Sequence, residues 1–331
     1  MKVIDMHCDT ITEIYEKVKS GEECSLRDNK FHLDLLRMKK SDYLLQNFAV
    51  FVNLVECENP LEYTLKVIDF FHEQIKSNKD VIRLVHKYKD IEENNKLGLM
   101  SALLTIEEGG TTKLDLAHLR NFYRLGVRML TLTWNFENGI GHPNFSFHKG
   151  EIPHFTTPNT KDGLTDFGIE FVGEMEKLGM IIDVSHLSDA GFYDVLNYTK
   201  KPFVASHSNA RSMCNHVRNM SDDMIKKLSD RGCVMGMNFC TSFLKDGMSK
   251  EEEENCISLV VDNIKHIINV GGYECIGLGS DFDGIATNLG IKDVTYMPIL
   301  ADRLKKERLS NIEIEAVFSK NVLRLYKEVL N

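Results

Sequence analysis

Eight short runs of mostly apolar residues recur along the chain, and stretches with helical spacing separate them. Near-continuous apolar runs are typical of strands that are covered on both faces, as in a parallel sheet. In the stretches between them, apolar residues recur about every three to four positions, which predicts amphipathic helices. The predicted strands are 3–10, 46–54, 99–107, 127–134, 180–186, 202–208, 233–239 and 275–282.

Helix boundaries can be read from residues that favour helix starts and stops. Gly126 and Gly179 stand where a helix should end before the next strand. Ser221 is a good N-cap, and two aspartates follow it in the first turn. The predicted helices are 61–76, 114–125, 167–178, 224–228, 250–268 and 311–330, the last packed on the barrel as a final helix.

Strand and helix alternate eight times, which favours a closed (β/α)8 barrel, the TIM-barrel fold, over a doubly wound open sheet. No GxGxxG or GxxxxGK[ST] phosphate loop follows a predicted strand. We predict a single domain over residues 1–331. Two long insertions, 11–45 and 135–165, interrupt the alternation, and the second is a candidate active-site loop because it follows the fourth strand. It contains His142, His148 and His154.

Charge and hydropathy exclude several classes of protein. The 331 residues include 40 Lys and Arg against 49 Asp and Glu, a net charge of −9, which argues against nucleic-acid binding. No apolar run reaches the ~18 residues of a membrane span, and polar residues interrupt the N-terminal segment where a signal peptide would be apolar. We therefore expect a cytoplasmic protein with no nucleic-acid or membrane partner. The 8 cysteines form no CxxC pair, so we expect them to be reduced.

Polar side chains gather at the ends of the predicted strands, where a (β/α)8 barrel places its active site. His7 and Asp9 alternate at the end of the first strand, so they share one face and suit a divalent metal ion. A glutamate ends the third strand, where a carboxylate is costly unless it is paired or bound to metal. The other strand-end residues are His186, His207 and Asp281, after strands five, six and eight.

Each of these residues alone has an ordinary structural explanation, such as a hydrogen-bonded core histidine. Together they are enough for two metal ions, one on His7 and Asp9 and the other on His186 and His207, with a glutamate between them. Two metal ions can hold a shared hydroxide and polarise a carbonyl group, which suits amide hydrolysis.

The chain resembles the membrane (renal) dipeptidase family, peptidase family M19, within the amidohydrolase-like metal-dependent hydrolases. The resemblance covers nearly the whole chain and implies a two-zinc site in a (β/α)8 barrel, with other divalent metals as alternatives, and a homodimer. It rests on the segments IDMHCDT, LLTIEEGG, LRNFYRLGVRMLTLTWN, DGLTDFGIEFVGEMEKLGMIIDVSHLSD, PFVASHSNAR, VRNMSDD and LGSDFDG.

The resemblance also implies roles for single residues. His7 and Asp9 would bind one zinc, His186 and His207 the second, and a glutamate would bridge them. Arg218 of the RN-x-x-DD motif would meet the carboxylate of the dipeptide. Asp281, the first aspartate of DFDG, would handle a proton, whereas we expect Asp283 to cap the following loop.

Two adjacent glutamates compete for the bridging position. The family reads E-G-G after its third strand, whereas this chain reads Glu107-Glu108-Gly109-Gly110. Glu108 matches the glycines, and Glu107 keeps a gap-free spacing to LRNFYRLGVR. We predict that Glu107 is the bridging ligand.

Other positions depart from the family pattern. Trp134 stands where mammalian members carry a histidine that touches the substrate, and Cys240 stands where a tyrosine is usual. We expect Trp134 to contact the substrate and His142 to replace part of the missing histidine. A late Gly-Gly-Asn pattern is replaced by Ser319-Lys320-Asn321.

These observations predict a zinc-dependent dipeptidase that hydrolyses free dipeptides through a metal-bridging hydroxide, with Asp281 passing a proton to the leaving amine. The family's tolerance of D-residues extends the expected substrates to dipeptides with a C-terminal D-residue. The alternative is an amidohydrolase of another small amide, such as an N-acyl amino acid. Trp134 and Cys240, which depart from the family pattern, are compatible with this alternative. A third interpretation is a non-catalytic metal-binding protein. Such a protein would be expected to lack some of the metal ligands, whereas this chain has all of them.

Overall fold

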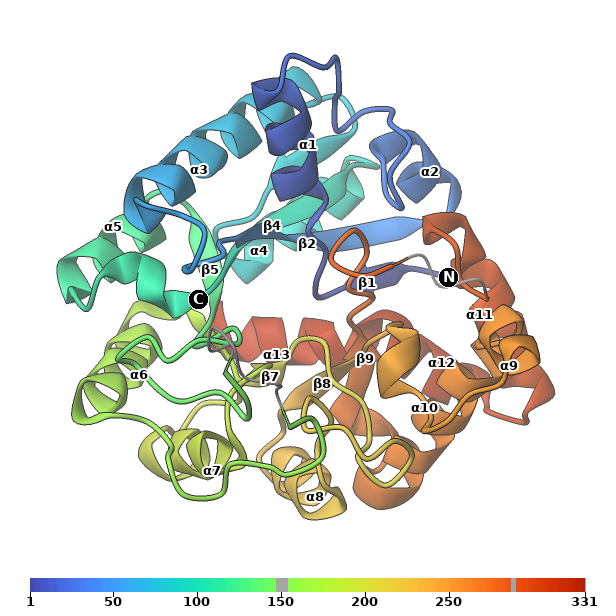
Figure 1. The fold of residues 1–331 in the computed structure, drawn as a ribbon. Helices are drawn as coiled ribbons and strands as arrows, with labels where there is room; N and C mark the ends of the chain where they lie inside the picture. Colours follow the sequence, from blue (N-terminus) through green and yellow to red (C-terminus); the bar gives the residue numbers. More distant parts are fainter. Residues whose placement is uncertain (147–153, 287–289, 331) are drawn as a thin grey trace.

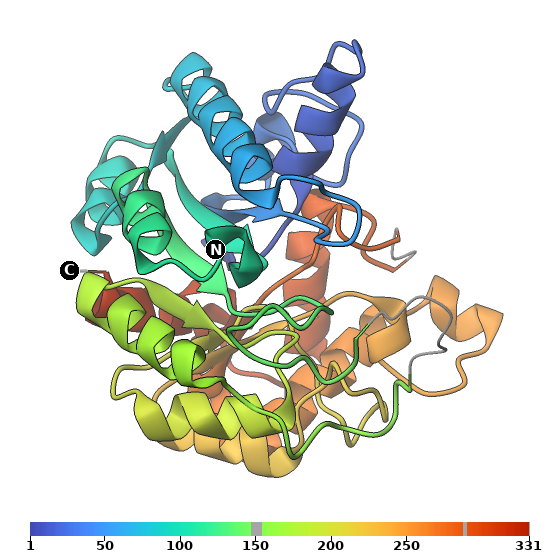
Figure 2. The ribbon, with the colours of Figure 1, turned by 60° about the vertical axis from the view of Figure 1, so that its left-hand side comes forward.

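The structure, a computed structural model, describes residues 1–146, 154–286 and 290–330, and it forms a closed parallel barrel surrounded by helices (Figures 1 and 2). Around the barrel the strands follow the order β1, β2, β4, β5, β6, β7, β8, β9, and β9 pairs with β1 to close it. The prediction of a (β/α)8 barrel is therefore confirmed. The barrel strands are β1 (Val3–Asp5), β2 (Tyr43–Phe51), β4 (Met100–Glu107), β5 (Val127–Thr131), β6 (Ile181–Asp183), β7 (Val204–Ala205), β8 (Val234–Met237) and β9 (Ile276–Leu278).

A ninth strand, β3 (Ile82–Leu84), was not predicted. It pairs with the first residues of β4, Met100 to Ala102, whereas β5 pairs with β4 from Leu104 onward. The strand is short, and the exposed Arg83 interrupts its apolar pattern, so hydropathy alone does not distinguish it from a loop. It lies outside the closed ring of eight.

Helices follow the strands and cover the outside of the barrel, as Figure 1 shows. The α-helices are α1 (Thr10–Lys19), α2 (Leu35–Lys40), α3 (Pro60–Ser77), α4 (Tyr88–Lys96), α5 (Leu116–Arg124), α6 (Asp166–Leu178), α7 (Asp189–Tyr198), α8 (Asp222–Asp230), α9 (Lys250–Glu254), α10 (Ile257–Gly271), α11 (Met297–Lys306), α12 (Asn311–Glu315) and α13 (Asn321–Val329). Short 3-10 turns are η1 (Gly109–Thr112), η2 (Thr241–Phe243), η3 (Tyr273–Cys275) and η4 (Val294–Tyr296), and η5 (Ala316–Lys320) is π-helical.

Several helix predictions need correction. The insertion 11–45 holds most of α1, which starts after the short segment 6–9 that follows β1, and all of α2, which begins where the Asp34 side chain accepts the Arg37 amide. The predicted helix 250–268 is divided at Asn255 into α9 and α10. The predicted helix 311–330 is three consecutive segments, since the π-helical turn η5 separates α12 from α13. Helices α4, α7 and α11 were not predicted.

The N-terminal end of the barrel is closed by α13, which lies across the middle of the barrel in Figure 1. Its residues Val322, Leu325, Tyr326 and Val329 are buried against the apolar inner layer of the strands. The hydroxyl of Tyr326 accepts a hydrogen bond from the side-chain Nδ2 of Asn47 at 2.7 Å and donates one to the side-chain Oδ1 of Asn47 at 3.0 Å. This closed end leaves only the C-terminal ends of the strands for a site.

Across the ranges that the structure describes, none of the helices is both long and apolar enough to span a membrane. His148, one of the histidines of the insertion 135–165, lies outside the described residues. The cysteines, which were expected to be reduced, are all free thiols.

Candidate functional site

The predicted metal-ligating residues converge at the C-terminal mouth of the barrel. Because all barrel strands are parallel, the loops that follow them meet at one rim. Each of these side chains is buried. They are His7 and Asp9 after β1, Glu107 as the last residue of β4, His186 after β6, His207 after β7, and Asp281 after β9.

The carboxylate of Glu107 lies at the centre of the cluster. Its Oε1 is 3.2 Å from His186 Nε2 and 3.4 Å from His207 Nε2. Its Oε2 is 3.4 Å from His7 Nε2, which is 3.3 Å from Asp9 Oδ2. One carboxylate therefore faces two separate groups of ligand-type side chains.

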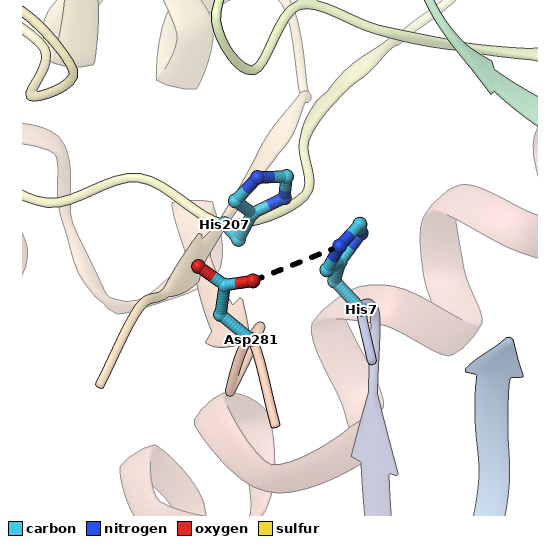
Figure 3. Close-up of side chains that lie close together, drawn as sticks. All are labelled: His7, His207 and Asp281. Carbon is cyan, nitrogen blue, oxygen red and sulfur yellow. Dashed lines mark ion pairs between the residues drawn. The ribbon is translucent and has the colours of Figure 1, made fainter. Parts of the chain in front are cut away.

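Asp281 completes the cluster from the β9 side. Figure 3 shows its carboxylate facing His7 and His207, and Oδ1 lies 3.8 Å from His7 Nε2. Its other oxygen accepts a hydrogen bond from Asn238 Nδ2 at 2.9 Å. Asn238 therefore orients Asp281, a role that the sequence did not reveal.

Buried polar atoms without a partner show that this donor set fits a divalent metal. Within the described part of the chain, both ring nitrogens of His7 and Oδ1 of Asp9 are buried and make no hydrogen bond. Such atoms are costly unless a ligand satisfies them. Ligand atoms gather in three overlapping groups: His7, Asp9 and Glu107; Glu107, His186 and His207; and His7, His207 and Asp281.

Hydrogen bonds at the far side of each ring set the tautomers of His186 and His207. Ser206 Oγ donates its one proton to Asp183 Oδ2 at 2.6 Å, so His207 Nδ1–H must be the donor to Ser206 at 2.8 Å. His186 Nδ1 likewise donates to Asn135 Oδ1 at 2.9 Å. Both Nε2 atoms are left with a free lone pair, 3.0 Å apart, as metal-binding imidazoles require.

The electrostatics of the histidines agree with this assignment. Burial, with the nearby charge of Arg218, lowers the pKa of His186 to about 3. Burial lowers the pKa of His207 well below its usual value, and the charge of His7 adds to the effect. Both rings are therefore neutral at pH 7. Burial also opposes a positive charge on His7. The carboxylates of Glu107 and Asp9 outweigh the effect of burial and raise the pKa of His7 well above its usual value. The surroundings of His7 therefore favour a positive charge.

Two buried aspartates hold the loops that carry these residues. Asp183, the last residue of β6, accepts the Ser206 amide at 2.8 Å. Asp5, the last residue of β1, accepts the amides of His7 at 3.2 Å and Ser280 at 2.9 Å. Neither aspartate was predicted to have a role, although an aspartate at a strand end, before the ligand-bearing loop, was the available signal.

The backbone is strained where the ligands leave the strands. His186 and Asp281 have φ angles of 68° and 64°, in the left-handed region that side chains other than glycine rarely adopt. Such conformations persist at functional sites because the surrounding structure enforces them. The loop after β9 also needs Gly284, since a Cβ there would lie 2.1 Å from Asp9 Oδ2 and 2.7 Å from Asp281 Oδ1.

Glu108 has a different environment from Glu107. Its carboxylate accepts hydrogen bonds from the amides of Gly110 at 2.7 Å and Trp134 at 2.9 Å, and from the side chain of Asn138. Burial raises the pKa of Glu108 to about 7. Glu108 therefore holds the loop between β4 and α5 against the loop after β5, whereas Glu107 faces the histidines.

A cavity of about 390 Å³ opens over this cluster. Its lining includes the predicted substrate residues Arg218 and Trp134, and also Cys240. The ring of Trp134 packs 5.7 Å from His186 and 5.1 Å from Phe51, between ring centroids. Further lining residues are Asp9, Thr12, Glu13, Glu107, Asn135, Phe145, Phe243, Asp281, Asp283, Gly284, Ile285 and Ala286.

Arg218 is buried and only partly satisfied. Its Nη2 donates to the His207 carbonyl oxygen at 3.2 Å, and the guanidinium lies 5.6 Å from the ring of Phe243. Among the described residues its Nε has no hydrogen-bond partner, and no carboxylate lies within ion-pair distance of it. A buried guanidinium in this state is a suitable partner for an anionic group of a ligand.

His142 does not belong to this cavity. Its Nδ1 lies 2.9 Å from the Gly163 carbonyl oxygen, and the ring is not part of the cavity lining. The segment that carries His142 pairs with the segment around Gly163 and Leu164, and the predicted contact of His142 with the substrate stays a prediction. His154, also in this insertion, is exposed.

Comparisons with known proteins agree with this geometry. The sequence model of the membrane dipeptidase family, peptidase family M19, matches residues 1–331. An uncharacterised dipeptidase of Schizosaccharomyces pombe is 32% identical over 99% of this chain and 80% of its own length. The dipeptidase tcpJ of Claviceps purpurea is 29% identical over 92% of this chain and 70% of its own length.

Two solved structures are also similar. Dipeptidase AC, a metallopeptidase of family M19, has a TM-score of 0.89 and 27% identity, covering 100% of this chain and 99% of its own. A Rhodobacter sphaeroides metallopeptidase, liganded with a phosphinate mimic of L-Ala-D-Ala, has a TM-score of 0.87 and 25% identity, covering 99% of both chains. The chain therefore belongs to the membrane dipeptidase family, peptidase family M19, and is a hydrolase of the metallo-dipeptidase type.

Proposed function

We propose that this protein hydrolyses free dipeptides with two divalent metal ions, zinc being the expected ion, held at the mouth of the barrel. The observation that carries the proposal is the position of Glu107 between two groups of ligand-type side chains. His7 and Asp9 would hold one ion and His186 and His207 the other, with Glu107 as the bridging ligand. When bound, such ions supply a hydroxide at neutral pH and polarise the scissile carbonyl group.

Asp281 would move the proton during hydrolysis. Its Oδ1 faces the cluster and its Oδ2 is held by Asn238, so only one oxygen is available to the reacting groups. Burial raises the pKa of Asp281, which favours a carboxyl group able to hold a proton. We infer that Asp281 accepts a proton from the attacking water and gives it to the leaving amine, as a general base and then a general acid.

Arg218 would bind the C-terminal carboxylate of the substrate. Its charge has no anionic partner among the described residues, and the aromatic rings of Trp134 and Phe243 line the same cavity. These rings exclude water and strengthen the ion pair. The ligand of the Rhodobacter sphaeroides relative, a mimic of L-Ala-D-Ala, supports including dipeptides with a C-terminal D-residue.

Metal analysis and a substrate panel would test the proposal. Protein purified without chelator should contain about two divalent ions per chain and hydrolyse L-Ala-L-Ala and L-Ala-D-Ala. N-acetyl amino acids, which lack the free amino group, should be poor substrates. Metal content near zero with no activation by Zn²⁺ would contradict the metal site, whereas a preference for N-acyl amino acids would assign the site to another small amide.

The homodimer and the single domain over 1–331 stay predictions, which light scattering and limited proteolysis would test.

A further inference from the structure

A second cavity adjoins the one over the ligand cluster. It has a volume of about 580 Å³. Thr12, Glu13 and Phe51 line both cavities, so the two spaces adjoin at these residues. The rest of its lining comes from α1, the segment after β2, and α3, and includes Glu16, Lys19, Glu56, Glu58 and Tyr63.

The barrel topology places this second cavity opposite Arg218. Arg218 follows β7, whereas Phe51 ends β2, and four steps separate β7 from β2 in either direction around the eight-stranded ring. Figure 1 shows the corresponding helices, α1 and α3 on one side of the barrel and α8 on the other. A dipeptide with its carboxylate on Arg218 and its peptide bond over the ligand cluster therefore directs its N-terminal residue toward the second cavity.

The walls of the second cavity are acidic. Four glutamates line it against one lysine. Glu16 is paired with Lys19, whose Nζ lies 3.0 Å from it and 5.5 Å from the ring centroid of Tyr63. Glu56 and Glu58 are exposed to solvent, where charge is well screened.

Glu13 differs from the other three glutamates. It is half-buried at the junction of the two cavities, and no cationic side chain among the described residues lies within ion-pair distance of it. Burial, with Asp283 and Glu16 nearby, raises the pKa of Glu13, and the more distant charge of Lys17 only partly opposes this shift. A negative charge in this position is stabilised by a cation brought by a ligand.

We propose that the second cavity receives the side chain of the substrate's N-terminal residue and that Glu13 selects a cationic side chain, lysine or arginine. The inference rests on the proposed dipeptidase function and adds a substrate class to it. The recognised group is an ammonium or guanidinium on a long aliphatic stem, whose methylene groups pack on Phe51 while the charged end pairs with Glu13.

Two dipeptides that differ only in the terminal charge would test this inference. Norleucyl-alanine retains the aliphatic stem of lysyl-alanine and lacks its ammonium group. The metal-loaded wild-type enzyme should favour lysyl-alanine by about tenfold in kcat/KM, as expected for a partly shielded ion pair. In Glu13→Gln this ratio should fall below about twofold, and in Glu13→Lys it should reverse.

Glu23→Gln is the matched control, because Glu23 is exposed and lines neither cavity. This variant should retain the wild-type ratio. Equal kcat/KM values for the two substrates in the wild-type enzyme, or an unchanged ratio in Glu13→Gln, would overturn the assignment of Glu13 while leaving the dipeptidase function intact. Failure of the wild-type enzyme to hydrolyse either substrate, or L-Ala-L-Ala, would contradict the proposed function itself.

Discussion

The Tyr326–Asn47 pair at the N-terminal end of the barrel and the ligand-type cluster at the C-terminal end differ in how their buried polar atoms are satisfied. At the N-terminal end, Tyr326 and Asn47 satisfy each other with two hydrogen bonds inside an apolar layer. At the C-terminal end, His7, Asp9 and Arg218 keep buried nitrogen or oxygen atoms that have no partner among the described residues. The first pair is therefore satisfied within the protein, whereas the cluster at the other end is suited to a ligand.

The energetic difference between the ends follows from the cost of burial. A buried polar group that finds its partner contributes modestly to stability, whereas one left without a partner costs roughly 1–3 kcal/mol. The C-terminal end bears several such costs and also positive backbone φ angles at Glu108, His186, Asp281 and Asp283. Substitutions there should change activity more than stability, and the reverse should hold at the closed end.

The largest effect is expected at Glu107. Glu107→Gln should lower kcat/KM on the order of 10³-fold, because the central carboxylate holds charge at the reacting centre. Glu108→Gln should change activity only mildly, since Glu108 binds only the loop, and should act on stability, because the glutamine NH2 would face an N–H donor where one carboxylate oxygen now accepts. Steady-state kinetics and metal analysis of both variants would check this. A severe loss in Glu108→Gln with an active Glu107→Gln would show that Glu108 is the bridging ligand.

Arg218 should show the next largest effect. Arg218→Met should cost ~2–4 kcal/mol in kcat/KM for free dipeptides, the range for truncating one member of a buried charge pair. Dipeptide amides should be poor substrates for the wild-type enzyme, and the variant should no longer distinguish them from the free dipeptides. If the wild-type enzyme hydrolysed amides and free dipeptides equally well, Arg218 would not bind the carboxylate.

Asp281→Asn should retain metal and lower kcat by about 10²-fold, the lower end of general acid–base contributions. The matched control is Asp283→Asn. Asp283 accepts hydrogen bonds from the Thr10 hydroxyl at 2.5 Å and the His32 amide at 2.7 Å, so its loss should act mainly on thermal stability. A fully metallated Asp281→Asn enzyme with near-wild-type kcat would remove Asp281 from the proton transfer.

The smallest effect on activity is expected at the closed end. Tyr326→Phe should lower the free energy of unfolding by about 1–2 kcal/mol, because the Asn47 amide loses its partner in an apolar layer. kcat should not change. Urea unfolding and steady-state kinetics of the metal-loaded protein would measure both quantities, and a fall in kcat at unchanged stability would show that the two ends are coupled.

The eight barrel strands were predictable from the sequence because buried parallel strands have continuous apolar runs, and their alternation with helices predicted the closed barrel. The convergence of His7, Glu107, His186 and His207 was predictable for a related reason, since these residues end or follow strands that share one rim. Strand β3 was missed because three residues around an exposed Arg83 carry no clear pattern. The break between α9 and α10 was missed because no glycine or proline marks it.

Sequence alone determined which residue types stand at the strand ends, and hence the family, the barrel and the metal-binding chemistry. Only the tertiary structure decided which way each side chain points. Glu107 and Glu108 are identical and adjacent, yet Glu107 ends β4 facing the histidines, while Glu108 turns away at a φ of 107° to bind the loop after β5. His142 is directed to Gly163 in the same way. Such directions depend on contacts between segments far apart in the chain, which local patterns of residues do not contain.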